Sequence, residues 1–283
     1  MSDNYIHSTI YIDNFEIPIF IISLKNDSQR RSLLSNFLPK EIINNYFPAL
    51  DFRNKSENEL EKFMDLNKLI KNEIYNRKLT GGEIGCAESH KSIYKYMEIN
   101  NLPFALILED DVVPQKKWQN KLGKVLNDLK LIGNEKALVC NIGIDYYRST
   151  PSKNILISFI PFIFCKIIKL VNFQKTDLFL AHSYIINLKG ARNILNKYKK
   201  YESVCDDWKF FYQDKCLDYV FISECIFIQN TTLNSNIRER QISINPDLNI
   251  NKVFQIFISI KAIIKIIMNN INPQNWFYFR YKL

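Results

Sequence analysis

Three consecutive carboxylates, Glu109, Asp110 and Asp111, are the strongest chemical feature of the sequence. Adjacent carboxylates repel one another unless a positive charge faces them, and otherwise one of them takes up a proton. Hard oxygen ligands of this kind suit Mg²⁺ or Mn²⁺, particularly a cation that also binds a diphosphate. The alternative is a solvated acidic turn that caps the next element. The residues alone leave both interpretations open.

A glycine-rich stretch, L-T-G-G-E-I-G-C-A-E-S-H at 79–90, precedes the carboxylates and contains three of the seven glycines of the chain. Thr80 and Glu83 form a capping box, T-x-x-E, which predicts that a helix begins here. The glycines either permit the turn and the close packing of that helix, or leave its N-terminal N–H groups open to a phosphate or a sugar hydroxyl. His90 lies on the same helical stripe as Glu83, where a hydrogen-bonded core histidine is more common than a catalytic one.

A second acidic pair, Asp206 and Asp207, also has two interpretations. Asp206 is placed to be the N-cap of a helix over D-W-K-F-F, whereas either carboxylate is suited to remove a proton from a hydroxyl as a general base. Ser183 and Cys205 belong to residue types that act as nucleophiles, but no G-x-S-x-G motif supports that role. The sequence also has no P-loop and no G-x-G-x-x-G motif.

Two apolar runs must position these side chains. I-P-I-F-I-I-S-L at 17–24 predicts a buried strand that leads through a polar turn into a helix. F-A-L-I-L at 104–108 predicts a second strand, which runs directly into the acidic triplet. In an α/β fold, ligands bind beyond the carboxyl ends of such strands. If the extended backbone continues through the triplet, Glu109 and Asp111 point to one side and Asp110 to the other.

The remaining elements follow from the same patterns. The helix that begins at the capping box is expected to continue to about Asn100. Further strands are expected at 136–143, 178–187 and 219–229, a strand end at 47–53, and helices at 55–78 and from Lys189 onward.

The composition indicates a globular protein with a cationic end. Of its 283 residues 47% are hydrophobic, and the formal net charge is +9. The basic residues do not form one stripe interleaved with aromatic side chains, which argues against a nucleic-acid partner. No acidic residue follows Asp247, so we expect a main domain over 1–247 and a basic, aromatic tail over 248–283. Such a tail suits an anionic membrane surface, and burial in the core or in a dimer contact is the alternative.

The cysteines and the most apolar segment further restrict the class. The six cysteines show no C-x-x-C spacing and no signal peptide is recognisable, which favours a reducing cytoplasm. None of the three histidines neighbours a cysteine pair in sequence, so a buried zinc site is not expected. Residues 154–171 are divided by Pro161 and are too short for a membrane span. We interpret them as core, or as an insertion that faces a membrane or an acceptor.

Taken together, residues 17–240 resemble glycosyltransferase family 25, whose members act in lipopolysaccharide and lipooligosaccharide biosynthesis. The most specific parts are the stretch at 79–90 and A-L-I-L-E-D-D-V at 105–112, in this order and separation. The resemblance implies a GT-A-like fold with a mostly parallel central sheet, a UDP-sugar donor, Mn²⁺ or Mg²⁺, and inversion at the anomeric carbon. Galactose is the sugar that the family commonly uses. Transfer of glucose or an N-acetylhexosamine, or a protein that binds the nucleotide sugar or a glycan without catalysis, are the alternatives.

The resemblance also assigns roles to residues. Glu109 and Asp111 match the metal-binding positions of the acidic motif. Asp206 or Asp207 is expected to be the general base of a single displacement, with Glu83 or Glu88 as the alternative. The donor-binding positions implied are Ser23, Leu24, Arg30, Asp51, Gly82, Gly85, Ser89, His90 and Asp110.

Two positions depart from the family pattern, because Ser23 stands where Asn is common and Phe52 stands where Gly is usual. Residues 150–176 match no part of it, and we expect them to shape the choice of acceptor. The implied acceptor is a lipid-linked glycan. The implied location is cytoplasmic, with peripheral contact to the inner membrane through the tail.

Overall fold

The computed structural model describes residues 5–71, 77–143, 167–171, 173 and 178–230. The predicted domain boundary at 247, the basic tail and most of the apolar segment 154–171 lie outside these described residues. Their predicted roles therefore stay predictions.

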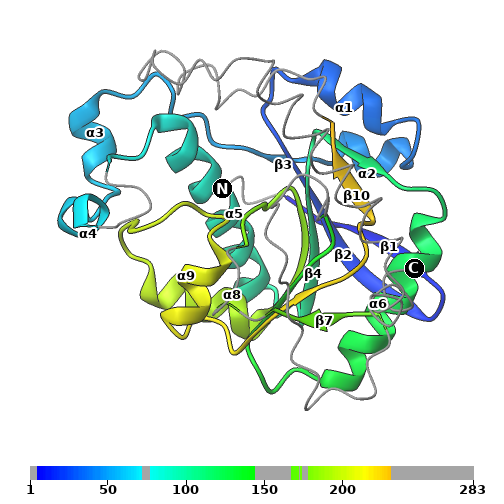
Figure 1. Ribbon diagram of the computed structural model, residues 1–283. Helices are drawn as coiled ribbons and strands as arrows, with labels where there is room; N and C mark the ends of the chain where they lie inside the picture. The colour runs from blue at the N-terminus through cyan, green and yellow to red at the C-terminus, as the bar shows by residue number, and fades with distance from the viewer. Residues whose placement is uncertain (1–4, 72–76, 144–166, 172, 174–177, 231–283) are drawn as a thin grey trace, which may run out of the picture. The chain divides into compact units, whose positions relative to one another are not determined.

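A central sheet of eight strands organises the described chain, in the order β1-β2-β4-β8-β6-β9-β7 with β3 beside β2 (Figure 1). β2, β3, β4, β6 and β9 run in one direction, and β1, β7 and β8 run in the other. The predicted α/β class is confirmed. Most strands of the sheet run in one direction, but the sheet contains both parallel and antiparallel pairs. For example, β8 is antiparallel to both of its neighbours. The strands are β1 Ser8–Ile12, β2 Phe15–Ser23, β3 Phe47–Pro48, β4 Phe104–Glu109, β6 Leu138–Asn141, β7 Lys169–Leu170, β8 Ser183–Asn187 and β9 Tyr219–Ile222.

Helices cover both faces of the sheet (Figure 1). Alternate side chains of β4 enter two separate cores: Ala105 and Ile107 pack on the side of α5 and α8, and Leu106 and Leu108 pack on the side of α6. A strand that is buried on both faces is apolar throughout, which explains the unbroken run that predicted it. No helix of the described residues is long and apolar enough to cross a membrane. The helices are α1 Ser28–Leu34, α2 Lys40–Asn44, α3 Glu57–Glu61, α4 Leu66–Lys71, α5 Gly81–Ile99, α6 Trp118–Ile132, α8 Leu188–Lys197 and α9 Trp208–Gln213.

The strand-rich segment expected at 219–229 contains two strands. β9 ends at Ile222, and after an interruption β10, Phe227–Gln229, pairs with β5, Val112–Pro114, outside the main sheet. Apolar residues on both sides of the break hide it from a periodicity argument. Because β5 follows the acidic triplet directly, this small ribbon brings Gln229 next to it.

The predicted capping box is confirmed at the start of α5. The Thr80 hydroxyl accepts a hydrogen bond from the Glu83 N–H at 3.2 Å, and the Glu83 carboxylate accepts one from the Thr80 N–H at 2.8 Å. Glu83 is buried and also binds Arg77, with 2.6 Å between Oε1 and Nη2. Burial raises the pKa of Glu83, but the contacts with Arg77 and Thr80 together have the larger effect. The pKa is therefore below its usual value, and the group stays ionised. These contacts give Glu83 a structural role.

The glycines of α5 allow the segment after β3 to lie directly on the helix. A Cβ added at Gly81 would overlap the carbonyl oxygen of Phe52, and one added at Gly85 would come within 2.5 Å of the carbonyl oxygen of Leu50. Ser89 fastens the same segment, since its hydroxyl accepts a hydrogen bond from the Leu50 N–H at 2.8 Å. Close packing, one of the two interpretations of this stretch, is therefore the role of Gly81 and Gly85 in the structure.

Replacing either glycine with alanine is expected to destabilise the fold. Because the overlapping atoms at Gly81 and Gly85 belong to the backbone, they cannot move aside as a side chain can, and we expect a loss of about 1–3 kcal/mol or more. Gly123→Ala is the matched control, since its Cβ meets only the Asp13 carboxylate and an Ile12 methyl. Alanine is also favoured over glycine by about 1 kcal/mol inside a helix such as α6. Urea unfolding of the three variants measures the difference, and equal midpoints would contradict this packing.

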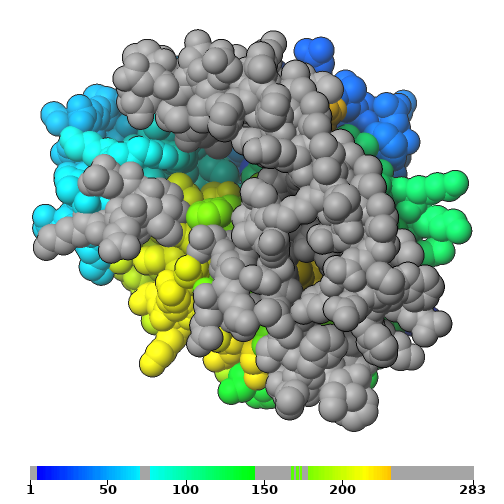
Figure 2. All heavy atoms as spheres, in the orientation of Figure 1, coloured from blue at the N-terminus to red at the C-terminus, as the bar shows by residue number. Residues whose placement is uncertain are grey.

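On one side of the molecule the segment that contains α3 and α4 lies against the chain near Tyr201, where cyan and yellow regions meet (Figure 1 and Figure 2). The N–H of Asp65 donates to the Tyr201 carbonyl at 2.9 Å, and Lys68 forms an ion pair with Glu202 at 2.7 Å. The Tyr201 hydroxyl donates to Glu88 on α5. These contacts anchor the turn that carries Asp206 and Asp207.

Candidate active site

Three strands meet at the edge of the sheet where the acidic triplet lies. β2 and β4 are parallel, and their register places Ile22 opposite Glu109, so both strands end together. The antiparallel strand β8 begins at the same place, where the N–H of Glu109 donates to the carbonyl of His182 at 2.8 Å. We call this edge, with Ser23, the acidic triplet and His182, the carboxyl edge. This is the position at which α/β folds bind ligands.

Arg30 supplies the positive charge that the adjacent carboxylates require. Its Nε donates to Asp110 Oδ1 at 2.6 Å, and its Nη2 lies 3.0 Å from Asp111 Oδ2. Ser23 donates to the second oxygen of Asp110 at 2.6 Å, so both oxygens of that carboxylate are occupied. Burial nevertheless raises the pKa of Asp110, against the effect of Arg30 and Ser23. The predicted donor-binding residues Ser23, Arg30 and Asp110 thus form one connected group.

Asp111 keeps one oxygen available. Its Oδ2 accepts from Gln229 at 3.1 Å in addition to Arg30, whereas its Oδ1 is buried without a hydrogen-bond partner among the described residues. Burial and the charge of Glu109 raise the pKa of Asp111 to about 7, although Arg30 opposes them. A positive charge placed at Oδ1 would stabilise this carboxylate.

Glu109 lies next to His90. Its Oε1 lies 3.7 Å from His90 Nε2, which is an ion-pair distance but not a hydrogen bond. The expected alternation along the triplet is wrong: β4 ends at Glu109, and Asp110 and Asp111 lie in a turn, where the strand geometry no longer holds. Asp110 and Asp111 therefore share Arg30, instead of pointing to opposite sides. These carboxylates could hold a hard cation at Asp111 Oδ1, beside the charge of Glu109. Asp110 would support that site by holding Arg30.

His90 is a buried histidine with one nitrogen bound. Its Nδ1 lies 2.7 Å from the Tyr184 hydroxyl, while Nε2 has no hydrogen-bond partner in the described part of the chain. Burial lowers the pKa of His90, but the contacts with Cys86 and Glu109 together have the larger effect and raise it to about 9. Burial would raise the pKa of Glu109, and the charge of His90 holds it below the usual value. The structure gives His90 both a core hydrogen bond and a charged contact with the triplet.

Buried polar atoms without partners gather around this edge. Within the described residues five such side-chain atoms occur, and four belong to His90, Asp111, His182 and Ser183. A buried polar atom left unpaired costs about 1–3 kcal/mol, and Asp111 Oδ1 is the one of these four that belongs to a carboxylate of the acidic triplet. Neither His182 nor Ser183 was predicted as a site residue. Their sequence context, at the start of an apolar strand, carries no motif that marks them.

The acidic pair before α9 divides into two roles. Asp207 is the N-cap, since it accepts from the Phe210 N–H at 3.0 Å and from the Ser203 hydroxyl at 2.8 Å. The prediction that Asp206 caps this helix is wrong by one residue. Asp206 is half-buried and accepts from the Leu180 N–H at 3.1 Å. Burial and the charge of Glu109 raise its pKa to about 6, a value suited to a general base.

Other predicted donor-binding residues lie elsewhere or serve the fold. Asp51 is exposed and binds Arg53 through two contacts of 2.8 and 2.5 Å. The Ser89 hydroxyl donates to the Gly85 carbonyl at 2.6 Å, which fixes it inside α5. These contacts of Ser89 and Gly85 serve the packing of α5 against the segment after β3.

Leu24 and Gly82, two further predicted donor-binding residues, lie at the end of β2 and at the start of α5. The carbonyl of Leu24, directly after β2, accepts a hydrogen bond from Arg31. Gly82 is half-buried in the first turn of α5. Arg31 in turn packs its guanidinium 3.9 Å above the centre of the Tyr46 ring, which orients the turn between β2 and α1.

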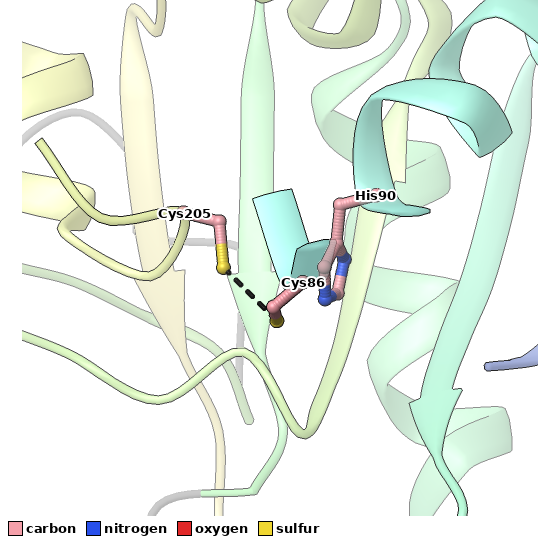
Figure 3. A group of neighbouring side chains, drawn as sticks. All are labelled: Cys86, His90 and Cys205. Atoms are coloured by element: carbon pink, nitrogen blue, oxygen red, sulfur yellow. Dashed lines mark hydrogen bonds between the residues drawn. The ribbon is translucent and has the colours of Figure 1, made fainter. Parts of the chain in front are cut away.

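Two cysteines near His90 also escaped the sequence analysis. Cys86 and Cys205 are separated by 3.4 Å between their sulfur atoms, and both lie beside His90 (Figure 3). The expectation that no histidine neighbours a cysteine pair is therefore wrong in space, although it holds along the chain. The spacing of Cys86 and His90, four residues apart on one helix, could have indicated from the sequence that these two side chains are neighbours. Cys205 gave no such indication, because it is 119 residues away from Cys86.

In an α/β fold, a charged and partly unsatisfied site beyond the strand ends stands where ligands bind. The chain matches the model of glycosyltransferase family 25 (LPS biosynthesis protein) over residues 16–216, and it belongs to this family. The resemblance stated from the two motifs is confirmed.

Individual relatives match a smaller part. A glycosyltransferase 25 family member of Aedes aegypti is 32% identical over 120 residues, which are 41% of this chain and 19% of the relative. Procollagen galactosyltransferase 2 of Mus musculus is 31% identical over 113 residues, 39% of this chain and 18% of the relative. A probable inactive glycosyltransferase 25 family member 3 of Rattus norvegicus is 31% identical over 113 residues, 39% and 20% of the two chains. The match thus spans about a fifth of the length of these relatives.

Proposed function

We propose that this chain is an inverting glycosyltransferase that moves a sugar, galactose in the first instance, from a UDP-sugar to a hydroxyl of a glycan. The single observation that carries the proposal is the unpaired, buried Oδ1 of Asp111 beside Arg30, whose guanidinium is held by Asp110 and Asp111. Family membership and a relative named as a galactosyltransferase support the reaction and the sugar.

The donor diphosphate belongs at Arg30 and Asp111 in this proposal. A bound Mn²⁺ or Mg²⁺ would supply positive charge to the diphosphate as it leaves. Asp111 would hold that cation through Oδ1, with the Glu109 carboxylate nearby, while Arg30 remains fixed by Asp110. A guanidinium that is already oriented stabilises developing negative charge without reorganisation.

The general base is Asp206. Of the carboxylates predicted for this role, Asp207 caps α9 and Glu83 is bound by Arg77 and Thr80. Glu88 accepts from Tyr201 and lies 3.2 Å from Lys91. Asp206 would take the proton of the acceptor hydroxyl as that oxygen attacks the anomeric carbon opposite the leaving UDP. No side-chain nucleophile takes part in such a single step.

The proposed acceptor is a lipid-linked surface glycan of the lipooligosaccharide or lipopolysaccharide type. The description of the matched family as an LPS biosynthesis protein supports this choice. A cytoplasmic location, with the basic tail at the inner membrane, stays part of the same proposal.

A second candidate function is binding of a nucleotide sugar or a glycan without catalysis. It is favoured by the relative whose name describes it as probably inactive. A third, transfer of glucose or an N-acetylhexosamine, differs from the first only in the donor sugar.

Release of UDP from UDP-sugars tests these candidates. The full chain is incubated with UDP-galactose, UDP-glucose or UDP-N-acetylglucosamine, with Mn²⁺ or with EDTA, and UDP is measured. We expect slow, cation-dependent hydrolysis of one donor, fastest with UDP-galactose. Binding of a donor by calorimetry without UDP release, even with added galactose- or glucose-terminated acceptors, would favour the non-catalytic function. Absence of both binding and release would contradict the nucleotide-sugar site altogether.

A further inference from the structure

A cluster of soft metal ligands lies next to the proposed catalytic site. Cys86 and His90 come from one face of α5, four residues apart, and Cys205 comes from the turn before α9 (Figure 3). One potential ligand atom of each residue lies within 4.8 Å of the others. None of the roles derived above uses either thiol.

The spacing of these atoms matches a tetrahedral site. With bonds of about 2.3 Å to sulfur and about 2.0 Å to nitrogen or oxygen, ligand atoms around zinc lie about 3.3–3.8 Å apart. The sulfur atoms of Cys86 and Cys205 are 3.4 Å apart. One ligand atom from each of Cys86, His90 and Cys205 lies within 4.8 Å of the other two, so these three residues are close enough to share one ion. Glu109 lies next to this cluster, with its Oε1 3.7 Å from His90 Nε2.

His90 is oriented as a metal ligand. It is 2% exposed, and its Nε2 has no hydrogen-bond partner among the residues that the structure describes. Its Nδ1 is bound to the hydroxyl of Tyr184, which lies 2.8 Å from the hydroxyl of Tyr94. Ligating histidines characteristically bind a second polar group through the other nitrogen, which fixes the ring and its tautomer. With Nδ1 engaged by Tyr184, Nε2 is the nitrogen that can bind a cation once it has released its proton.

We infer that Cys86, His90 and Cys205 form a three-ligand zinc site next to Glu109. Two thiolates and an imidazole select a borderline cation such as Zn²⁺ over Mg²⁺ or Mn²⁺, so this site differs in chemistry from an oxygen site at Asp111. Binding releases the protons of the two thiols and of Nε2. The ion ties the turn that carries Asp206 to α5, and thus holds that carboxylate in place.

Metal analysis and cobalt substitution test the site. The full chain, purified without a metal-affinity tag and without chelator, is expected to contain about one zinc per chain. Replacement by Co²⁺ should produce the thiolate-to-cobalt charge-transfer band and the strong visible bands of a tetrahedral site. Excess Mn²⁺ should not remove these bands, because manganese does not displace cobalt from thiolates. Bands that Mn²⁺ abolishes would assign the ion to the carboxylates instead and overturn the inference.

The variants C86S and C205S are each expected to weaken Co²⁺ binding by at least about tenfold and to lose the charge-transfer band in part. C225S is the matched control, since Cys225 is another half-buried thiol but lies outside the cluster, and its bands should equal those of the unmodified chain. Cobalt bands unchanged in C86S and C205S would overturn the inference. So would a chain without zinc and without cobalt bands, or a Cys86–Cys205 disulfide in the purified protein. Because the cobalt spectrum is recorded on the unmodified chain, it decides the matter even if a variant does not fold.

Discussion

Asp111→Asn is expected to reduce donor turnover by about 10²–10³-fold while leaving the fold at least as stable at pH 8. The activity is lost because the amide cannot hold a cation or help orient Arg30 beside the diphosphate. Stability is kept because the fold disfavours the charge of Asp111, whose pKa rises to about 7 through burial and the nearby Glu109. Turnover of the UDP-sugar and thermal unfolding, measured on the same preparation, follow both effects.

The sign of the pH dependence follows from the raised pKa. A carboxyl that binds its proton more tightly in the folded than in the unfolded state stabilises the fold when protonated, and this contribution is lost as the pH rises toward 7. The unmodified chain should therefore fall behind Asp111→Asn in melting temperature above pH 7 and approach it at low pH. Added Mn²⁺ should raise the melting temperature of the unmodified chain more than that of the variant.

Asp13→Asn is the control for this substitution. It makes the same chemical change at an exposed turn between β1 and β2, where Asp13 has a φ of 52° that asparagine readily adopts. Its turnover and melting temperature should equal those of the unmodified chain. If Asp111→Asn keeps full turnover, the carboxyl edge does not hold the donor diphosphate, and the proposed site is wrong.

The second large effect separates two neighbouring carboxylates. Asp206→Asn is expected to lower kcat by about 10²–10⁴-fold with the donor KM unchanged, because it removes the general base. Its melting temperature above pH 6 should be at least that of the unmodified chain, because burial disfavours the charge of Asp206. Asp207→Asn is expected to keep kcat but lose about 1 kcal/mol of stability, because the amide nitrogen no longer accepts the Ser203 hydrogen bond. Steady-state kinetics and urea unfolding of both variants measure these effects. Asp206→Asn should lose kcat without losing stability, and Asp207→Asn should lose stability without losing kcat.

The pH profile of the unmodified enzyme provides an independent check on Asp206. Only its ionised form can accept a proton, so kcat should fall as the pH drops through about 6, the pKa that burial and Glu109 give it. This limb should be absent from the residual activity of Asp206→Asn. Equal losses of kcat in the two variants would place the base on another residue.

The candidate site trades stability for chemistry. Burial and then the charge of Glu109 raise the pKa of Asp111 and Asp206, and the unpaired atoms of His182 and Ser183 add a further cost. Selection for stability alone would remove these features, so their concentration at one edge is the mark of a functional surface.

Much of the fold was predictable from local patterns. The capping box of Thr80 and Glu83, the apolar run of β4 and the acidic triplet at its end all depend on residues within a turn or a strand of one another. Interactions over such short distances are determined by sequence spacing, so the start of α5 and the place of the triplet were correct. Where the local backbone changed from strand to turn, at Asp110, the predicted directions of the side chains failed.

The sequence by itself therefore determined the α/β class, the helix start and the residues that carry negative charge. Only the tertiary structure decided which groups face that charge: Arg30 is 80 residues from Asp110, Tyr184 is 94 residues from His90, and Cys205 is 119 residues from Cys86. It also decided that Asp207 caps α9 while Asp206 accepts from the Leu180 N–H. The physical reason is that such contacts depend on which strands pair and which helices cover them, and no single segment contains that information.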